Sequence, residues 1–136
     1  KTPRAPATGQ STFDFSVRPH AKLDAEWAHQ AGQVEIDALL VGRRSGKSVV
    51  FVVEAKIGEP SSLAKHKLVY PALAVAPRVP DGMEIVPVYL RVTATAEGLC
   101  FAVAECSLPD PRGGRPPAVS ELQPGQMTSI LLPLDR

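Results

Sequence analysis

The segment from Ser48 to Lys56 reads SVVFVVEAK, an apolar run that ends with a carboxylate and an ammonium two residues apart. We predict a buried strand here, and on a strand Glu54 and Lys56 project to the same face because side chains repeat every two residues. The preceding segment, Val34–Val41 (VEIDALLV), predicts an antiparallel neighbour that brings Asp37 to the same region. Two carboxylates and one cation are therefore expected to converge.

These three residue types have the chemistry of a divalent-metal site. Neighbouring carboxylates repel each other unless one takes up a proton, whereas a hard cation such as Mg²⁺ removes the repulsion and gains oxygen ligands. Mg²⁺ keeps several waters, and one of them is a candidate nucleophile that Lys56 can position. We predict a phosphodiesterase in which Asp37, Glu54 and Lys56 are catalytic. The alternative is a solvated ion pair at a strand end.

The same stretch resembles the PD-(D/E)xK nuclease superfamily, whose common fold is that of the restriction endonucleases. That pattern is an acid on one strand, a hairpin, (D/E)-x-K on the next strand and a helix often carrying Gln or Tyr, and QVEIDALL, VVFVVEAKIGEP and KLVYP follow it. The resemblance implies a restriction-endonuclease-like α/β fold with helices flanking a mixed central sheet. It also implies a Mg²⁺- or Mn²⁺-dependent endonuclease that cuts DNA, with Asp37, Glu54 and the Ala55 carbonyl as metal ligands. Lys67 departs from the pattern, because it stands where Gln is expected.

Two further acids are candidates for an accessory role. Glu35 shares a predicted strand face with Asp37, two residues earlier in the chain. Glu26 lies in a predicted upstream helix, where the superfamily often places another acid. An exposed helical Glu is the simpler interpretation of Glu26.

Basic residues occur on both sides of the motif. Lys65 and Lys67 follow it and are candidate phosphate contacts. The turn GRRSGKS carries Arg43 and Arg44, which are candidates for the same role. This turn is one residue short of a nucleotide-binding loop and precedes β-branched residues instead of a helix, so we interpret it as a polar hairpin turn.

The hydrophobic pattern predicts a mixed sheet with helical cover, as one domain over residues 11–136. The predicted strands are residues 11–17, 34–41, 48–55, 85–92 and 99–104, and the predicted helical segments are residues 20–30 (a short helix or turn) and 63–76. Pro71 predicts a bend or break near Val69. A tail rich in Pro and Gly over residues 107–126 precedes a last apolar run at residues 129–134.

Composition narrows the function classes. With 136 residues and a formal net charge of +1, the chain has room for one ordinary domain and lacks a polyanion-sized basic field, so we expect weak, salt-sensitive DNA binding. Cys100 and Cys106 indicate free thiols in a reducing compartment.

No apolar run is long enough to span a bilayer, and we expect a cytoplasmic protein without a membrane partner. The linker-like residues 1–10 suggest the C-terminal domain of a longer protein, and a homodimer stays open.

The residues and the resemblance together favour a nuclease that acts on DNA. The alternative is a module that keeps the nuclease fold to bind DNA or a protein partner but has little or no catalysis. A more distant alternative is a structural or interaction domain in which these charges have no special role.

Overall fold

The computed structural model describes residues 12–58 and 64–134. Within these ranges the chain forms seven strands, one α-helix and two short 3₁₀ turns. The strands are β1 (Thr12–Val17), β2 (Trp27–Gln33), β3 (Ala38–Arg44), β4 (Lys47–Ile57), β5 (Glu84–Thr95), β6 (Gly98–Ser107) and β7 (Gln123–Pro133). The helix is α1 (His66–Val75), and the 3₁₀ turns are η1 (Ala76–Arg78) and η2 (Val119–Glu121).

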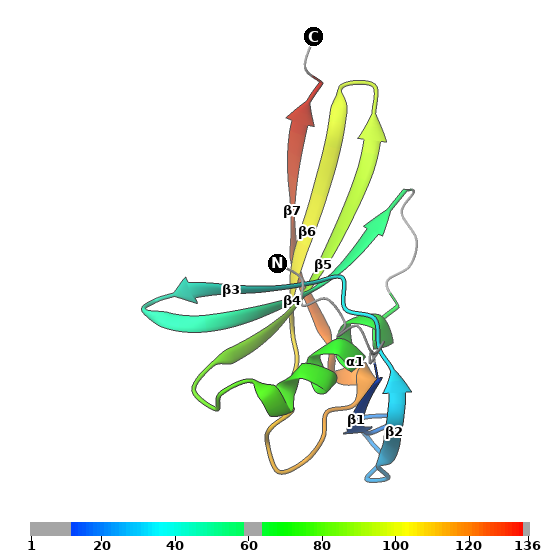
Figure 1. Ribbon diagram of the computed structural model, residues 1–136. Helices are drawn as coiled ribbons and strands as arrows, with labels where there is room; N and C mark the ends of the chain where they lie inside the picture. The colour runs from blue at the N-terminus through cyan, green and yellow to red at the C-terminus, as the bar shows by residue number, and fades with distance from the viewer. Residues whose placement is uncertain (1–11, 59–63, 135–136) are drawn as a thin grey trace.

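Five strands form a mixed central sheet in the order β3-β4-β5-β6-β7, while β1 and β2 form a separate antiparallel pair. β4 and β5 are parallel and the other neighbouring strands of the sheet are antiparallel. A parallel connection needs a crossover segment, and α1 lies within it (Figure 1). The predicted mixed α/β class is confirmed, but the described chain is rich in strand and covers the sheet with a single α-helix.

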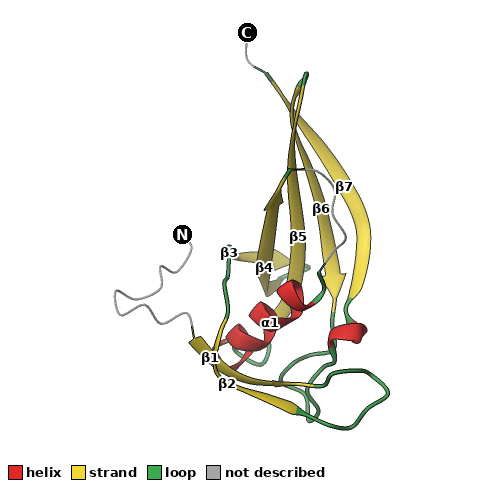
Figure 2. Cartoon of the chain, turned by 90° about the vertical axis from the view of Figure 1, so that its right-hand side faces the viewer, coloured by secondary structure: helices red, strands yellow, loops and turns green. Residues whose placement is uncertain are grey.

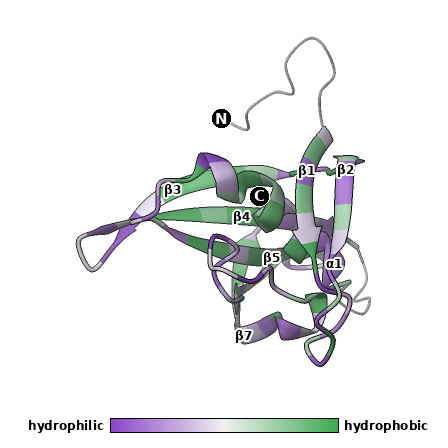
Figure 3. Ribbon diagram, turned by 90° about the horizontal axis from the view of Figure 1, so that it is seen from below, coloured by the Kyte–Doolittle hydropathy of each residue, from purple (hydrophilic) through white to green (hydrophobic). Residues whose placement is uncertain are grey.

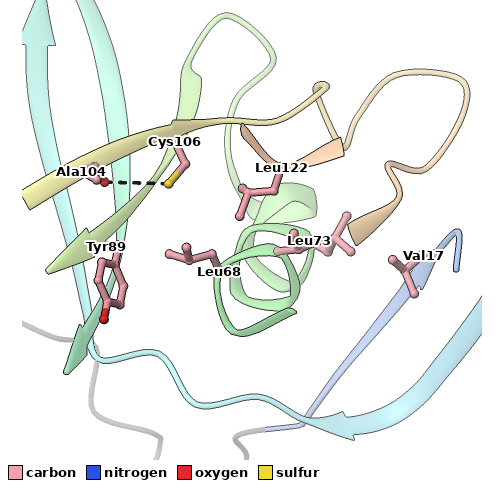
Figure 4. Packing of buried hydrophobic residues seen from close by; sticks show 8 residues of the cluster. Val17, Leu68, Leu73, Tyr89, Ala104, Cys106 and Leu122 are labelled. Atoms are coloured by element: carbon pink, nitrogen blue, oxygen red, sulfur yellow. Dashed lines mark hydrogen bonds between the residues drawn. The ribbon is translucent and has the colours of Figure 1, made fainter. Parts of the chain in front are cut away.

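The main core lies between α1 and the sheet. Its buried members are Val17, Leu68, Val69, Leu73, Tyr89, Ala104, Cys106 and Leu122 (Figure 4). On the same face Val50 and Val52 of β4 pack with Val75 at the end of the helix. Burial of an aliphatic side chain of this size is worth about 1.5–3 kcal/mol, so this contact fixes α1 on the sheet.

The opposite face of the sheet is apolar as well. Val49 and Val53 of β4 and Val86 and Val88 of β5 alternate with the residues that face α1, and they form a second cluster. Figure 3 shows β4 as hydrophobic along most of its length. No helix of the described chain covers this second face (Figures 1 and 2).

The sheet also extends lengthwise beyond the helix. Figures 1 and 2 show the far ends of β5, β6 and β7 running on past α1. We call this region the projecting half; it comprises residues 91–95, 98–102 and 129–133. β7 is exposed along its whole length, including Ile130 and Leu132.

A buried arginine ties the start of the domain to its end. Arg18 follows β1 and is 4% exposed. Its Nε donates to the Pro116 carbonyl at 2.7 Å, its Nη1 donates to the Ala21 carbonyl at 3.0 Å, and its guanidinium pairs with Glu121. These bonds satisfy a buried cation, as burial of a charge requires.

The predicted hairpin between the third and fourth strands is confirmed, with a tighter turn than expected. β3 and β4 are antiparallel, and the turn between them consists of Ser45 and Gly46 alone, because the strands extend into the segment GRRSGKS. Ser45 (φ 52°) and Gly46 (φ 77°) both have positive φ. This is the conformation of the two-residue turns whose twist matches that of paired strands.

Of the helix or turn predicted at residues 20–30, only a turn is present, closed by the Leu23 N–H on the His20 carbonyl at 3.0 Å. The helix is not formed, because residues 27–33 form β2. β2 pairs antiparallel with β1, with Trp27 opposite Val17. Leu23 and Trp27 were spaced as one face of a helix, but they are 50% and 58% exposed and have no core to cover. Pairing with β1 therefore outweighs the local helix propensity.

Two further features of the described chain differ from the predictions. Residues 34–37 lie outside any strand, and β3 starts at Ala38. α1 continues without a break from His66 across Pro71 to Val75, so the break predicted near Val69 is wrong. Leu68, Val69 and Ala72 are fully buried around the proline, and this packing holds the helix continuous despite the missing N–H donor. The predicted helix entry at residues 60–62 lies outside the described residues.

Residues 107–126 contain more regular secondary structure than their content of Pro and Gly predicted. The tail predicted as loop to residue 126 contains η2, and β7 already begins at Gln123. Cys100 and Cys106 both lie on β6 as free thiols. The described part of the chain has no helix that is long and apolar enough to cross a membrane.

Candidate functional site

Asp37 lies at the bend immediately before β3 and is fixed to the end of β4. Its Oδ2 accepts a hydrogen bond from the Ala55 backbone N–H at 2.8 Å. The β3–β4 register pairs Ala38 with Val53, so continuing the antiparallel register places Asp37 opposite Glu54. The sequence predicted Asp37 within a strand; it lies one residue outside, and a side-chain bond takes the place of the strand ladder.

Glu54 is half-buried, and its carboxyl group is hydrogen-bonded to that of Asp37. Burial raises the pKa of Glu54 to about 7, and the negative charge and hydrogen bond of Asp37 contribute to the same shift. Lys67 opposes this rise in pKa, whereas Glu35 adds to it slightly. Two carboxylates in contact share a proton when no cation neutralises them.

A cleft of about 190 Å³ opens beside this carboxylate pair. It is lined by Gln33, Val34, Glu35, Glu54, His66, Lys67, Tyr70 and Pro71. The linker before β3, the end of β4 and the first turns of α1 thus meet in one place. A larger hollow of about 350 Å³ lies elsewhere, around Arg44, Glu84 and Glu105. We assign function to the smaller cleft because it holds Glu54, the partner of Asp37.

Lys56 lies two residues beyond Glu54 on the same face of β4 and is half-buried. It forms no ion pair with another described residue. The cation whose charge lowers the pKa of Glu54 is that of Lys67, on α1, and not that of Lys56. The sequence pattern pointed to Lys56 on the strand, whereas the positive charge that lowers the pKa of Glu54 comes from the helix.

Of the two candidate accessory acids, only Glu35 lies at the cleft. Glu35 lines the cleft and is exposed, so it joins the carboxylate pair. Glu26 precedes β2 and lines a different hollow with Asp14 and Arg112. Glu26 is not brought to the cleft because the helix that was predicted to carry it is not formed.

The four candidate phosphate contacts lie in two different places. Lys67 lines the cleft and Lys65 lies at the start of α1. Arg43 donates to the Gly46 carbonyl at 3.1 Å, and Arg44 pairs with Glu105. Both arginines lie near the turn at the opposite end of β4, about seven residues or roughly 23 Å from Glu54. They are not part of this cleft.

A cluster of four rings borders the cleft, and sequence reasoning missed it. Phe15 and His29 stack with centroids 4.7 Å apart and an interplanar angle of 12°. Tyr70 lies 5.1 Å from His29 and 5.7 Å from His66. The alternating Phe residues of β1 were a signal for one side of the cluster. His29 lies in the segment predicted as a short helix or turn, so its stacking on Phe15 was not expected.

The carboxylates of Asp37 and Glu54 provide some, but not all, of the ligands of a divalent cation. In the described ranges no group of three or more His, Cys, Asp and Glu side chains is arranged as a metal site. Asp37 and Glu54 nevertheless bring two hard oxygen donors into contact, and a cation can replace the proton that they share. Mg²⁺ suits such a site because it binds through one or two carboxylates and keeps its remaining waters.

These observations define the class: a strand-rich mixed α/β domain with a carboxylate pair at the end of a buried strand. The chain belongs to a protein family described as a domain of unknown function (DUF6997), whose model matches residues 4–113. No curated protein matches the chain. No solved structure matches it either.

Proposed function

We propose that this domain is a Mg²⁺-dependent nuclease that hydrolyses DNA phosphodiester bonds, with a restriction-endonuclease-like arrangement of its site. The observation that carries the proposal is the contact between Asp37 and Glu54 where β4 leaves the core. Lys56 follows on the same strand face, which gives the order of acid, hairpin and E-x-K expected from the resemblance.

Each residue has a defined role in this proposal. Asp37 and Glu54 hold the cation, and the Ala55 carbonyl between Glu54 and Lys56 is the third protein ligand. When bound, the cation supplies Lewis acidity and a bound water of lowered pKa. Lys56 orients the attacking water and offsets the negative charge that develops on the phosphate.

The surroundings of the pair support the same chemistry. Lys67 lines the cleft beside Glu54 and supplies a cation to the phosphate backbone. The apolar core under Glu54 lowers the local dielectric, which strengthens the attraction of a carboxylate for a cation. Glu35 is exposed at the rim, where it can accept hydrogen bonds from waters around the cation.

A metal titration tests the carboxylate pair. We expect Mn²⁺ to bind the wild type, and Asp37→Asn to weaken that binding at least tenfold because a charged oxygen ligand is lost. Asn retains a side-chain oxygen that can accept the Ala55 N–H. The matched control is Asp14→Asn, because Asp14 also accepts a backbone N–H, from Ala31 at 2.6 Å, away from the cleft. Equal Mn²⁺ affinity in wild type and Asp37→Asn would show that the site is wrongly placed.

A cleavage assay tests the chemistry. Lys56→Ala is expected to retain Mn²⁺ but to nick supercoiled plasmid about 100- to 1000-fold more slowly, by analogy with removal of one preorganised donor. Glu54→Gln should lose both metal and cleavage. Lys47→Ala, at the other end of β4, serves as the control. Equal rates in wild type and Lys56→Ala, or no cleavage of supercoiled, linear, branched or single-stranded DNA by wild type, would reject the nuclease.

A binding module without catalysis is the second candidate, and the position of Lys67 favours it. Its ammonium already lowers the pKa of Glu54, as a metal ion would, and it stands where the nuclease pattern carries Gln. In that case Lys67 takes the place of the cation, and the cleft binds DNA or a protein partner without cutting. Mn²⁺ binding that appears only in Lys67→Gln would support this candidate.

A further inference from the structure

Two buried polar atoms in the described chain have no hydrogen-bond partner: the Tyr89 hydroxyl and the Arg91 Nε. Both residues lie on β5, two positions apart, so their side chains share one face. Tyr89 packs in the core cluster with Leu68 of α1, so this is the helix face of the sheet (Figure 4). Buried polar atoms are normally paired, and two unpaired atoms on one strand face indicate a missing partner.

These two residues are the strand neighbours of the proposed catalytic residues. In the parallel β4–β5 register, Glu54 pairs with Tyr89 and Lys56 pairs with Arg91. Adjacent strands lie about 4.8 Å apart, and paired residues project to the same face. The ammonium of Lys56 and the guanidinium of Arg91 therefore leave the sheet side by side.

Among the described residues, neither charge at this position has an ion-pair partner. The ion pairs formed among described residues involve Arg18, Arg44, Arg112 and Arg115, and none includes Lys56 or Arg91. Like charges placed opposite each other on neighbouring strands destabilise a sheet, and a half-buried guanidinium without a partner adds a desolvation cost. Such an arrangement is explained when an anion binds between the two cations.

We propose that Lys56 and Arg91 form a binding site for a phosphate group of the DNA backbone, with Arg91 as a positioning residue for the nuclease reaction. The inference rests on the proposed function and deepens it, because it identifies which strand neighbour of Lys56 holds the substrate. A guanidinium presents two parallel N–H groups that match two phosphate oxygens, which a lysine cannot do.

The position of Arg91 suits a long polyanion. α1 packs over Tyr89, whereas β5 continues from Arg91 to Thr95 into the projecting half (Figure 2). A DNA strand can therefore reach the phosphate site of Lys56 and Arg91 from the open side.

DNA binding without cleavage tests this site. The measurement is the fluorescence anisotropy of a labelled oligonucleotide, single-stranded or duplex, with Ca²⁺ in place of Mg²⁺. Arg91→Met is expected to raise the Kd about 10- to 100-fold, which is the range for a hydrogen bond to a charged group, and to reduce the slope of log K against log salt by about one phosphate contact. Arg91→Lys should lie between Arg91→Met and wild type.

Arg115→Met is the matched control, since it also removes one arginine, from an exposed ion pair with Asp24. It should change the Kd less than about threefold. Circular dichroism melting curves show whether Arg91→Met folds like wild type, and Arg91→Lys, which keeps the charge and the stem, gives the answer if it does not.

A chemical substitution in the DNA locates the contact. Methylphosphonate groups replace the phosphates of the oligonucleotide one at a time and remove a single negative charge each. At one position the difference between wild type and Arg91→Met should disappear, because the contact is already lost. Inorganic phosphate is titrated in parallel, and Arg91-dependent binding of free phosphate without Arg91-dependent binding of DNA would overturn the proposed ligand.

The outcomes separate this inference from the nuclease proposal. If wild type cleaves DNA and Arg91→Met binds and cleaves equally well, the phosphate site is wrong and the nuclease stands. If wild type binds DNA through Arg91 but never cleaves it, the phosphate site stands and the nuclease falls. If wild type neither binds nor cleaves DNA, both are wrong.

Discussion

The half of the central sheet under α1 and the projecting half differ in what surrounds them. Under the helix, Tyr89 and Ala104 are buried in a closed core. In the projecting half Ile130 and Leu132 of the edge strand β7 are more than half exposed, although their side chains are more apolar than those of Tyr89 and Ala104. The same strands, β5 to β7, run through both regions (Figure 1). Strand propensity alone therefore does not create a core, and a covering layer is needed on the face.

The candidate site lies on the border between these two regions. Glu54 and Tyr89 are register neighbours at the last positions with helix cover, and Lys56 and Arg91 are the next pair on that face. Burial on one side raises the pKa of Glu54, while the open side leaves room for a large substrate. Where the buried core meets the exposed sheet, a buried carboxyl group and open space for a substrate therefore lie only two residues apart on β4.

The largest expected effect is on the free energy of unfolding, when a leucine is replaced by alanine in each of the two halves. Leu68→Ala, at a position 1% exposed in the core, should lower the free energy of unfolding by about 2–5 kcal/mol. Leu132→Ala, at a position 56% exposed in the projecting half, should change it by about 0.5 kcal/mol or less. Urea unfolding of both variants measures the difference. Equal losses would mean that the projecting half is covered in solution, for example by a second copy.

A smaller effect is the change of stability with pH that Glu54 causes. The pKa of Glu54 is about 7 in the folded protein, above the value of about 4.3 of an unfolded Glu, so the folded state holds an extra proton between these values. The stability gained from this proton is complete below about pH 4 and is lost as pH rises through 7. Because Glu54 is partly solvated, screening should reduce the loss to about 1–2 kcal/mol.

Thermal melting between pH 5 and pH 8, without divalent cations, measures this loss. Glu54→Gln removes the titrating group while it keeps the shape, and its melting temperature should fall less across the same pH range. The same slope in Glu54→Gln and wild type would show that another group is responsible.

The smallest expected effect has the opposite sign. The Tyr89 hydroxyl is buried without a partner, so Tyr89→Phe removes a desolvated polar group and should raise the free energy of unfolding by about 1 kcal/mol. Tyr70→Phe is the control, because Tyr70 is half-buried at the cleft and should change stability by about 0.5 kcal/mol or less. A loss of stability in Tyr89→Phe would show that a bound water or another group pairs with the hydroxyl.

The elements with strong local patterns were predictable from the sequence. The five apolar residues from Val49 to Val53 mark a buried strand, and the polar turn before them marks a hairpin, because both signals come from neighbouring residues. The same reasoning placed Asp37 near Glu54, since a hairpin fixes which residues lie opposite each other. Only the position of Asp37 just outside β3 differed.

The remaining features depend on contacts between distant segments. β2 (WAHQAGQ) has little strand pattern of its own and is a strand because it pairs with β1. Arg91 becomes the neighbour of Lys56 through the parallel crossover over residues 58–83, and sequence spacing does not give the register of such a pair. Lys67 was noted as a departure from the nuclease pattern, but its approach to Glu54 follows from the docking of α1.

The bonds of Arg18 bear on how this chain folds while it is being made. Its buried guanidinium is satisfied by the Pro116 carbonyl and by Glu121, which are translated about a hundred residues later and lie beyond the segment matched by the family model. Until those residues leave the ribosome, the arginine remains hydrated and β1 lacks its final contacts. The first strand of the domain is therefore expected to be among the last to settle, and the domain should complete its folding only after nearly all of it has been synthesised.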